Sequence, residues 1–377
     1  MRLDEFKMER LQSTWENRVK FNLSESSVHP MSVRELISDP DFLEEVLDAP
    51  LFYNQSNGTD ELRSAIAACY PNATLDNVEV TNGGSEANFI TIYSMLDPGD
   101  EVVIILPNYG QIWGLTNSLG MSVREVHLRE DLQWAPDLEE LQSAATADTR
   151  MIVVCNPNNP TGAILTPAEM NAIIETAARS GAWILADEIY QGSERSGNTS
   201  QTFWGKYDRV IVTNGLSKAY GLPGLRIGWI VAPKDRIAKM WSYHDYTTIA
   251  PGTLSDTLAR VALSPGGRAR CFERTRGICR QNFPLFQRWI ETHGSMFRMV
   301  EPKAGAIAYV RYDLPINSTR LVERLLHEKS VLVVPGDHFG MDQFLRIGYG
   351  PQPDYLNRAL ELVNQVLETT THIESQP

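Results

Sequence analysis

Short, almost continuously apolar runs alternate with helical patterns between residues 51 and 231 of this 377-residue chain. Such β-rich runs are typical of parallel strands that are buried on both faces of a sheet. Alternation of this kind predicts an α/β fold, in which a mainly parallel sheet is flanked by helices. The runs occupy residues 78–81, 101–106, 151–155, 183–186 and 210–213.

Three parts are predicted along the chain. Residues 1–45 are expected to form an amino-terminal lid helix and loop that joins a small domain. Residues 46–265 form the large domain, and residues 266–377 form the smaller α+β domain, after the break at Pro265-Gly-Gly. In the first part, apolar residues at helical spacing predict one amphipathic helix from Asp4 to Val19. In the small domain, strands are expected at residues 307–310 and 331–334.

The composition excludes several functional classes. A formal net charge of −13 argues against binding to nucleic acid or to anionic membranes. The chain lacks an apolar run long enough to cross a membrane, and its charged amino terminus lacks a signal-peptide pattern. The four cysteines have no metal-ligand spacing, so no metal site is predicted. We interpret them as reduced thiols of a cytoplasmic protein.

Residues 214–229 lie between two β-rich runs and contain Lys218 and Arg226 among several glycines. Glycine allows the backbone to approach a ligand closely. If burial desolvates Lys218, its ammonium group loses a proton more readily, and the free amine becomes a nucleophile for carbonyl groups. The alternative interpretation is a solvated lysine in a turn.

The segment Ser-Lys-Ala-Tyr-Gly-Leu-Pro-Gly-Leu-Arg-Ile-Gly at residues 217–228 resembles the lysine segment of aspartate-aminotransferase-like (fold type I) pyridoxal-phosphate enzymes. Further motifs of that family follow in its order over nearly the whole chain. The resemblance implies Lys218 as the catalytic lysine and pyridoxal 5′-phosphate as the cofactor. The other matching motifs are Asn-Gly-Gly-Ser-Glu-Ala at residues 82–87, Pro-Asn-Tyr at 107–109, Asn-Pro-Thr-Gly at 159–162, Ala-Asp-Glu-Ile-Tyr at 186–190 and Phe-Leu-Arg-Ile-Gly at 344–348.

The turn at residues 82–87 follows a predicted strand and opens a predicted helix. Backbone N–H groups at such a place, together with the helix amino terminus, favour an anion. The resemblance implies that the backbone of Gly84, Ser85 and Glu86 holds the cofactor phosphate, with side-chain contacts from Ser217 and Arg226. An ordinary glycine-containing turn is the alternative.

The resemblance also assigns the residues around the cofactor ring. Asp187 pairs with the ring nitrogen, and Asn159 and Tyr190 contact the phenolic oxygen. Tyr109 stacks on the ring. Without the resemblance, Asp187 reads as a helix cap and Tyr109 as a core residue.

Two further residues extend the implied site beyond the cofactor. Arg346 is expected to hold the substrate α-carboxylate through two parallel hydrogen bonds. Tyr53 matches the tyrosine that is lent to the phosphate site of the neighbouring subunit. A homodimer with shared active sites is therefore implied.

The amino-terminal segments at residues 15–19 and 23–30 are similar to those of the pyridoxal-phosphate- and oxygen-dependent arginine oxidases and hydroxylases of bacterial natural-product pathways. That resemblance implies that this part closes over the site. His29 would act as an acid–base group and Glu16 would lie near a guanidinium group. Gly215 departs from the pattern, because common aminotransferases carry a phosphate-binding serine at this place.

The predicted function is oxidation of L-arginine with dioxygen as co-substrate, giving deamination with possible C4 hydroxylation or desaturation, in antibiotic biosynthesis. The alternative is an aminotransferase of the class I/II group that acts on an L-amino acid. A cyclase that acts on hydroxyarginine is a further variant. A cofactor-binding regulator is disfavoured, because no basic helix-turn-helix pattern precedes residue 50.

Overall fold

The computed structural model describes residues 3–372 and contains an eight-stranded sheet in the order β2-β9-β8-β7-β6-β3-β4-β5. Neighbours from β8 to β4 run parallel, and β2, β9 and β5 pair antiparallel at the two edges. The predicted mainly parallel sheet is therefore confirmed. Residues 1–2 and 373–377, at the ends of the predicted lid and small domain, lie outside the described range. In chain order, the strands are β2 (Val78–Thr81), β3 (Glu101–Leu106), β4 (Ser122–Arg129), β5 (Ala135–Pro136), β6 (Thr149–Cys155), β7 (Trp183–Asp187), β8 (Val210–Gly215) and β9 (Gly228–Val231).

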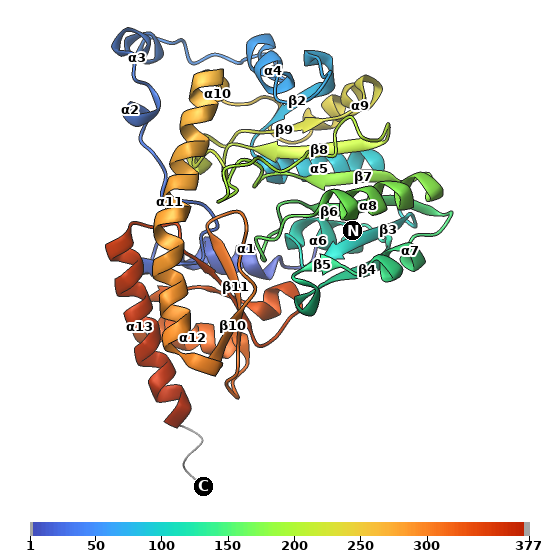
Figure 1. The fold of residues 1–377 in the computed structure, drawn as a ribbon. Helices are drawn as coiled ribbons and strands as arrows, with labels where there is room; N and C mark the ends of the chain where they lie inside the picture. The colour runs from blue at the N-terminus through green and yellow to red at the C-terminus, as the bar shows by residue number, and fades with distance from the viewer. Residues whose placement is uncertain (1–2, 373–377) are drawn as a thin grey trace.

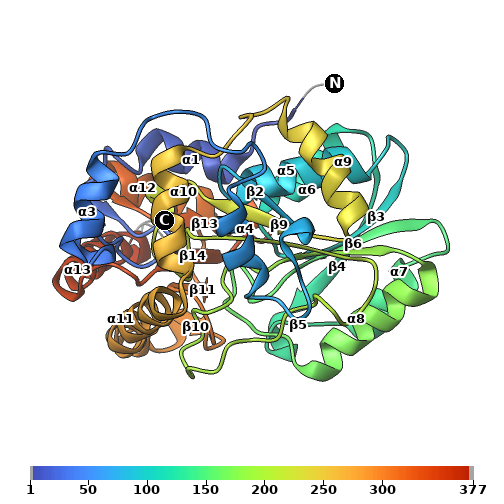
Figure 2. The ribbon, with the colours of Figure 1, turned by 90° about the horizontal axis from the view of Figure 1, so that it is seen from above.

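Helices cover both faces of this sheet, as the view from above shows (Figure 2). Val102 and Ile104 of β3 pack in the cluster under α5, α6 and α9, whereas Val103 and Ile105 pack in the cluster under α7 and α8. Because both faces are buried, Val102 to Ile105 of β3 are apolar at four successive positions rather than at alternate ones. The helices of this part are α4 (Asp60–Ala67), α5 (Gly84–Met95), α6 (Gly110–Ser118), α7 (Leu138–Ala144), α8 (Pro167–Ser180), α9 (Lys234–His244) and α10 (Thr253–Leu263).

A separate antiparallel sheet of four strands, in the order β10-β11-β14-β13, forms the centre of the smaller part. Its own hydrophobic cluster includes Phe286, Leu321, Ile347 and Leu356. The strands are β10 (Phe297–Met299), β11 (Ile307–Tyr312), β13 (Val334–Pro335) and β14 (Phe344–Gly348), and the helices are α11 (Pro265–Thr292), α12 (Ser318–Lys329) and α13 (Pro353–His372).

The long helix α11 begins at the break expected from the sequence. Ser264 caps it by accepting a hydrogen bond from Gly267 N–H, and Pro265 occupies the first turn, where a missing N–H costs nothing. The start of α11 therefore agrees with the predicted change of element. The domain limits at residues 45 and 265 stay predictions.

The expectation of one helix from Asp4 to Val19 was wrong in length, since α1 spans only Lys7–Trp15. The chain leaves the helix because it enters a strand pair: β1 (Phe21–Asn22) runs parallel to β12 (Val331–Leu332). The predicted strand at residues 331–334 is also divided. β12 pairs with β1, whereas β13 pairs with β14 of the other sheet.

The helix α1 lies between the two sheets (Figure 1). At one end, the rings of Phe6 and Tyr109 meet edge to face with centroids 5.1 Å apart. At the other end, Trp15 meets His327 of α12 with centroids 5.7 Å apart. The amino-terminal segment thus contacts both parts of the molecule. Two short helices, α2 (Val33–Leu36) and α3 (Pro40–Leu47), follow it.

Within residues 3–372, no helix is both long and apolar enough to span a bilayer. A search of the same residues finds no group of three or more histidine, cysteine or acidic side chains arranged to hold a metal ion.

Leu23 anchors the amino-terminal segment in the small-sheet core and is fully buried. We expect Leu23→Ala to lower the free energy of unfolding by about 2–5 kcal/mol, because it removes buried methyl groups and leaves a cavity. The matched control is Leu132→Ala at a side chain that is 43% exposed, which should change it by less than about 0.5 kcal/mol. Urea denaturation measures both, and equal effects would contradict the assigned burial.

Candidate functional site

A cavity of about 380 Å³ lies where several strands of the large sheet end. It is bounded by residues at or just past the carboxyl ends of β2, β3, β6, β7 and β8, which is the usual ligand position on such a sheet. Helix α1 contributes Met8, Glu9 and Gln12 to the wall. The predicted site residues in the lining are Glu16, Gly84, Ser85, Tyr109, Asn159, Asp187, Tyr190, Ser217, Lys218, Arg226 and Arg346.

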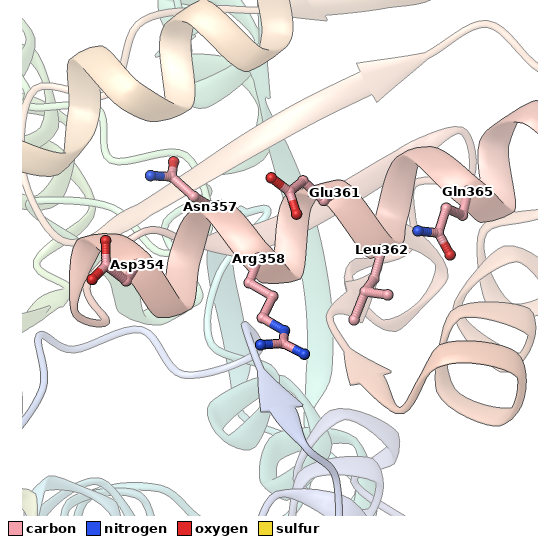
Figure 3. Close-up of a pocket in the computed structure, with 6 residues that line it drawn as sticks. All are labelled: Asp354, Asn357, Arg358, Glu361, Leu362 and Gln365. Carbon is pink, nitrogen blue, oxygen red and sulfur yellow. The ribbon is translucent and has the colours of Figure 1, made fainter.

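A second hollow, of about 390 Å³, lies along α13 (Figure 3). All of its lining residues come from that one helix, and none of them belongs to a sequence motif. The hollow is therefore a groove on a helix face, and the first cavity is the candidate site. The groove is lined by Asp354, Asn357, Arg358, Glu361, Leu362 and Gln365.

Lys218 forms an ion pair in the cavity with Glu25, whose Oε1 lies 2.9 Å from Nζ. Burial alone would lower the pKa of Lys218, as the sequence suggested, but the negative charge of Glu25 and the proximity of Tyr190 outweigh it and raise the pKa. The same pair lowers the pKa of Glu25 to about 2. Lys218 is therefore a protonated, paired ammonium until a ligand displaces Glu25.

Asp187 is a buried carboxylate at the end of β7 that faces the cavity. Ile189 N–H donates to its Oδ1 at 3.1 Å. Burial raises the pKa of Asp187 to about 6, although a hydrogen bond from Asn88 opposes the shift. Asn88 is itself oriented by Thr213, whose Oγ1 donates to Asn88 Oδ1 at 2.8 Å. No ion pair of Asp187 occurs among residues 3–372, so a cationic ring nitrogen in the cavity would complete its environment.

Arg346 is almost completely buried, with 1% of its surface exposed. Nη1 donates to Asn159 Oδ1 at 2.9 Å, and Nη2 donates to the Ser24 carbonyl at 2.6 Å. Burial lowers its pKa, against the opposing effects of Tyr190 and Glu25. Arg346 has no ion pair within the described part of the chain. A buried guanidinium of this kind is suited to bind a ligand carboxylate.

Two tyrosines, Tyr109 and Tyr190, line the cavity. Tyr190 is buried and donates its hydroxyl hydrogen to Ser26 Oγ at 2.8 Å. Tyr109 donates to Glu9 Oε1 at 2.9 Å, while Phe6 packs against its ring. The amino-terminal segment therefore holds both phenol groups.

The amino terminus of α5 supplies the anion-binding end of the cavity. Its N-cap residue, Gly83, has φ +93°, and a Cβ at this position would overlap the guanidinium group of Arg226. Gly228 of β9 also has no room for a side chain, because a Cβ there would overlap the backbone of Gly83 and Gly84. Glycine at both positions brings the helix end, the arginine and the strand together.

These features fit pyridoxal 5′-phosphate. Gly84, Ser85, Ser217 and Arg226 lie where a phosphate would be held by a helix end and a guanidinium group. Their cavity also contains a buried carboxylate for a ring nitrogen and an amine for a carbonyl carbon, provided by Asp187 and Lys218.

Three carboxylates of the amino-terminal segment, Glu9, Glu16 and Glu25, line the same cavity. Burial raises the pKa of Glu16, and the negative charges of Glu25 and Glu9 raise it further, whereas Lys218 opposes the shift. The carboxylates therefore repel one another in the absence of a ligand, and a cation placed among them would relieve that repulsion.

Three predicted site residues do not line the cavity. His29 Nδ1 lies 3.0 Å from Nη2 of Arg274, and burial, together with the charge of Arg274, lowers the His29 pKa. Tyr53 is on the surface, 77% exposed. Glu86 lies behind the turn, and its backbone N–H donates to the Gly83 carbonyl at 3.2 Å rather than into the cavity.

The motifs did not identify Glu9, Glu25, Ser26 or Asn88. The only signal for Glu25 is a charged residue among small polar ones in Ser-Glu-Ser-Ser, at residues 24–27. Asn88 lies in α5, directly after the turn at residues 82–87, and no sequence pattern marks it as a partner of Asp187. These residues act through contacts that only the fold creates.

Comparison with known proteins gives consistent matches. The family model described as aminotransferase class I and II matches residues 43–363. The capreomycidine synthase of Streptomyces vinaceus is 33% identical over 360 residues, which cover 93% of this chain and 91% of that protein. The aspartate/prephenate aminotransferase of Thermus thermophilus is 31% identical over 323 residues, covering 84% and 83%.

Solved structures agree with these matches. A pyridoxal-phosphate-dependent aminotransferase from Streptococcus suis superposes with a TM-score of 0.92 at 30% identity, covering 98% of this chain and 99% of that one. The pyridoxal-phosphate-dependent cyclase OrfR superposes with a TM-score of 0.89 at 26% identity, covering 98% of both chains.

The pair between Glu25 and Lys218 leads to a prediction for the cofactor-free protein. Glu25→Gln should lower the pKa of Lys218, because burial then acts without the opposing carboxylate. The measurement is the pH dependence of Lys218 acetylation by acetic anhydride, followed by peptide mass spectrometry. Its midpoint should move to lower pH in Glu25→Gln and stay in place in Glu9→Gln. A midpoint that rises or does not move in Glu25→Gln would contradict the assignment.

Proposed function

The chain belongs to the class I and II aminotransferase family, and on that premise we propose that this pyridoxal-phosphate-dependent enzyme acts on L-arginine or a close derivative of it. The observation that carries the proposal is the set of three glutamates, Glu9, Glu16 and Glu25, in the cavity that also contains Arg346. A substrate with a carboxylate at one end and a guanidinium group at the other matches both.

A dicarboxylic substrate, such as aspartate, is disfavoured by the same charges. Its second carboxylate would meet the glutamates of the amino-terminal segment rather than a cation. The cations of the cavity already have roles. Lys218 and Arg226 serve the cofactor, and Arg346 serves the α-carboxylate of the substrate.

When bound, pyridoxal phosphate provides an electron sink for the pair of electrons released at the substrate α-carbon. Lys218 is the base that removes the α-proton once the ligand has displaced Glu25, because its amine then loses the proton that the ion pair retains. Asp187 keeps a proton on the ring nitrogen. Arg346 orients the substrate, and α1 covers the cavity and keeps bulk water away from the reacting carbon.

The reaction that we propose first is oxidation of arginine with dioxygen as the electron acceptor. Its motivation is the amino-terminal segment, which resembles that of oxygen-dependent arginine enzymes. His29 would have to move from Arg274 into the cavity to take part as an acid–base group. Transamination of a cationic amino acid would use the same residues without His29.

Ring closure of a hydroxylated arginine is a second candidate. Two similar proteins favour it, one described as capreomycidine synthase and one as a pyridoxal-phosphate-dependent cyclase. The raised pKa of Glu16 suits a carboxylic acid that donates the proton with which a hydroxyl group leaves as water. A guanidine nitrogen would then bond to the carbon that lost the hydroxyl group, and the proton released from that nitrogen would return to the Glu16 carboxylate.

A homodimer with shared sites forms part of the proposal. Its support is the exposed run Leu51, Phe52 and Tyr53, together with Tyr246, which is also largely exposed. Large apolar side chains that are exposed together favour a protein interface.

Substrate charge gives the first test of the proposal. L-Arginine should be used with a KM at least about tenfold below that of L-citrulline, its uncharged analogue of the same shape. Glu16→Gln should reduce this preference by raising the KM for arginine, with little change for citrulline. Initial rates with both substrates measure the effect. An enzyme that prefers aspartate, or that uses citrulline as well as arginine, would overturn the substrate assignment.

Oxygen consumption separates the candidate reactions. In an oxygen electrode with arginine and no keto acid, an oxidase consumes oxygen and releases a product that mass spectrometry identifies. A transaminase turns over only after a keto acid is added. A cyclase leaves both acceptors unused and converts hydroxyarginine to a product lighter by one water. His29→Ala should impair the oxygen-dependent step by about 10²–10⁴-fold if His29 serves it, and equal rates would exclude that role.

A further inference from the structure

His244 ends α9, and its imidazole is fully buried between two carboxylates, outside the cavity lining. Nδ1 lies 2.8 Å from Glu79 Oε1 on β2. Nε2 lies 3.4 Å from Glu86 Oε2 on α5 and 3.2 Å from Thr248 Oγ1. The motifs of the sequence assign no role to His244 or Glu79.

The Glu86 carboxylate connects His244 to the phosphate-binding turn. Its Oε2 accepts the backbone N–H of Asn82 at 2.5 Å, and its Oε1 accepts the hydroxyl hydrogen of Thr248 at 2.8 Å. The Asn82 amide group also donates to the Ala250 carbonyl at 3.1 Å. The turn that opens α5 is therefore fastened to the segment that follows α9.

The Glu86 carboxylate and a cofactor phosphate would both lie at the amino terminus of α5, and both are negatively charged. Glu86 is the third residue of α5, and a carboxylate there stabilises the helix end. A cofactor phosphate, which carries about two negative charges, would be held by the same helix end. An uncompensated Glu86 would repel that phosphate.

The surrounding groups decide the protonation of this cluster. Burial would lower the pKa of His244, but hydrogen bonds to Glu79 and Glu86 outweigh it and raise the pKa to about 9. For Glu86, burial is outweighed by the hydrogen bonds that it accepts, and its pKa is lowered to about 2. Burial raises the pKa of Glu79 to about 7, although His244 and the charge of Arg63 oppose the shift. At neutral pH, Glu86 is therefore ionised beside a charged His244.

We propose that His244 is a positioning residue for the cofactor phosphate, because its charged ring cancels the Glu86 carboxylate and holds it in contact with the Asn82 backbone. The phosphate then meets the helix end and Arg226 without an uncompensated Glu86 carboxylate behind the turn. The inference depends on pyridoxal phosphate as the cofactor of the family, and it is independent of the proposed arginine substrate.

The first experiment compares two ligands that differ only in the phosphate group. Pyridoxal 5′-phosphate and pyridoxal are titrated against the cofactor-free, full-length protein, with tryptophan fluorescence as the readout. We expect His244→Gln to weaken binding of pyridoxal 5′-phosphate about tenfold at neutral pH, as for the loss of one nearby charge interaction. Binding of pyridoxal should change by less than about twofold, because no phosphate is present. The control is His127→Gln at an exposed histidine on β4.

The second experiment distinguishes charge compensation from a loss of packing. Glu86→Gln keeps an acceptor for the Asn82 N–H but removes the repelling charge, so it should bind pyridoxal 5′-phosphate at least as tightly as the wild type. The double variant His244→Gln/Glu86→Gln should return to within about threefold of the wild-type affinity, because the Glu86 charge and the His244 charge that compensates it are removed together. A double variant that binds pyridoxal 5′-phosphate more than about threefold more weakly than the wild type would overturn the proposal. The comparison of the double variant with the wild type also tests the proposal if His244→Gln does not fold by itself.

The pH dependence provides the third readout. The groups that face His244 are Glu79 from β2 and Glu86 from α5, and the charge of Arg63 acts on Glu79 from α4. His244 is charged below its raised pKa, so the preference for pyridoxal 5′-phosphate over pyridoxal should decline as the pH rises through about 9. In His244→Gln this decline should be absent. An unchanged profile in the variant, or an equal loss of affinity for both ligands, would overturn the proposal.

Discussion

The ion pair between Glu25 and Lys218 joins two segments that are 193 residues apart in the chain. A lysine in a cavity loses hydration, and the carboxylate compensates that loss. Glu25 is in turn held by the backbone N–H groups of Ser26 and Ser27, which donate to its Oε1. This ion pair joins the amino-terminal segment to the deepest point of the site, beside the contacts that Glu9, Ser24 and Ser26 make with Tyr109, Arg346 and Tyr190.

Two other charged residues, Asp187 and Arg346, line the cavity and are buried. Neither of them has an ion pair within residues 3–372. Leaving a charge in this state destabilises the folded chain, so the arrangement is understandable only if ligands supply the counter-charges. A cationic ring nitrogen and a carboxylate are the two complements. Ligand binding at both ends of the cavity should therefore stabilise the fold as well as prepare the reaction.

The sequence predicted the large sheet well because buried parallel strands carry a continuous apolar signal. The expected runs at residues 78–81 and 101–106 coincide with β2 and β3. Most of the residues predicted to contact the cofactor line one cavity, since the ends of parallel strands meet at one edge. The sequence could not show where α1 stops, because its end is set by the pairing of β1 with β12, more than 300 residues away. The division between β12 and β13 likewise depends on partners rather than on local pattern.

The same reasoning explains which contacts of the site leave no signal in the sequence. Glu25 and Asn88 act through contacts across the fold, and neither leaves a local signature. His29 was identified from its neighbours in sequence, yet a hydrogen bond with Arg274 holds it outside the cavity lining. A motif specifies the backbone course, and the direction of each side chain depends on the packing of other elements.

Two separate stretches of the chain provide most of the cavity residues that carry charge or suit a phosphate. Residues 84–226 provide most contacts suited to the cofactor, whereas the three glutamates all come from residues 9–25. Substitutions within the first thirty residues can therefore change the charge of the cavity while the residues suited to the cofactor stay the same.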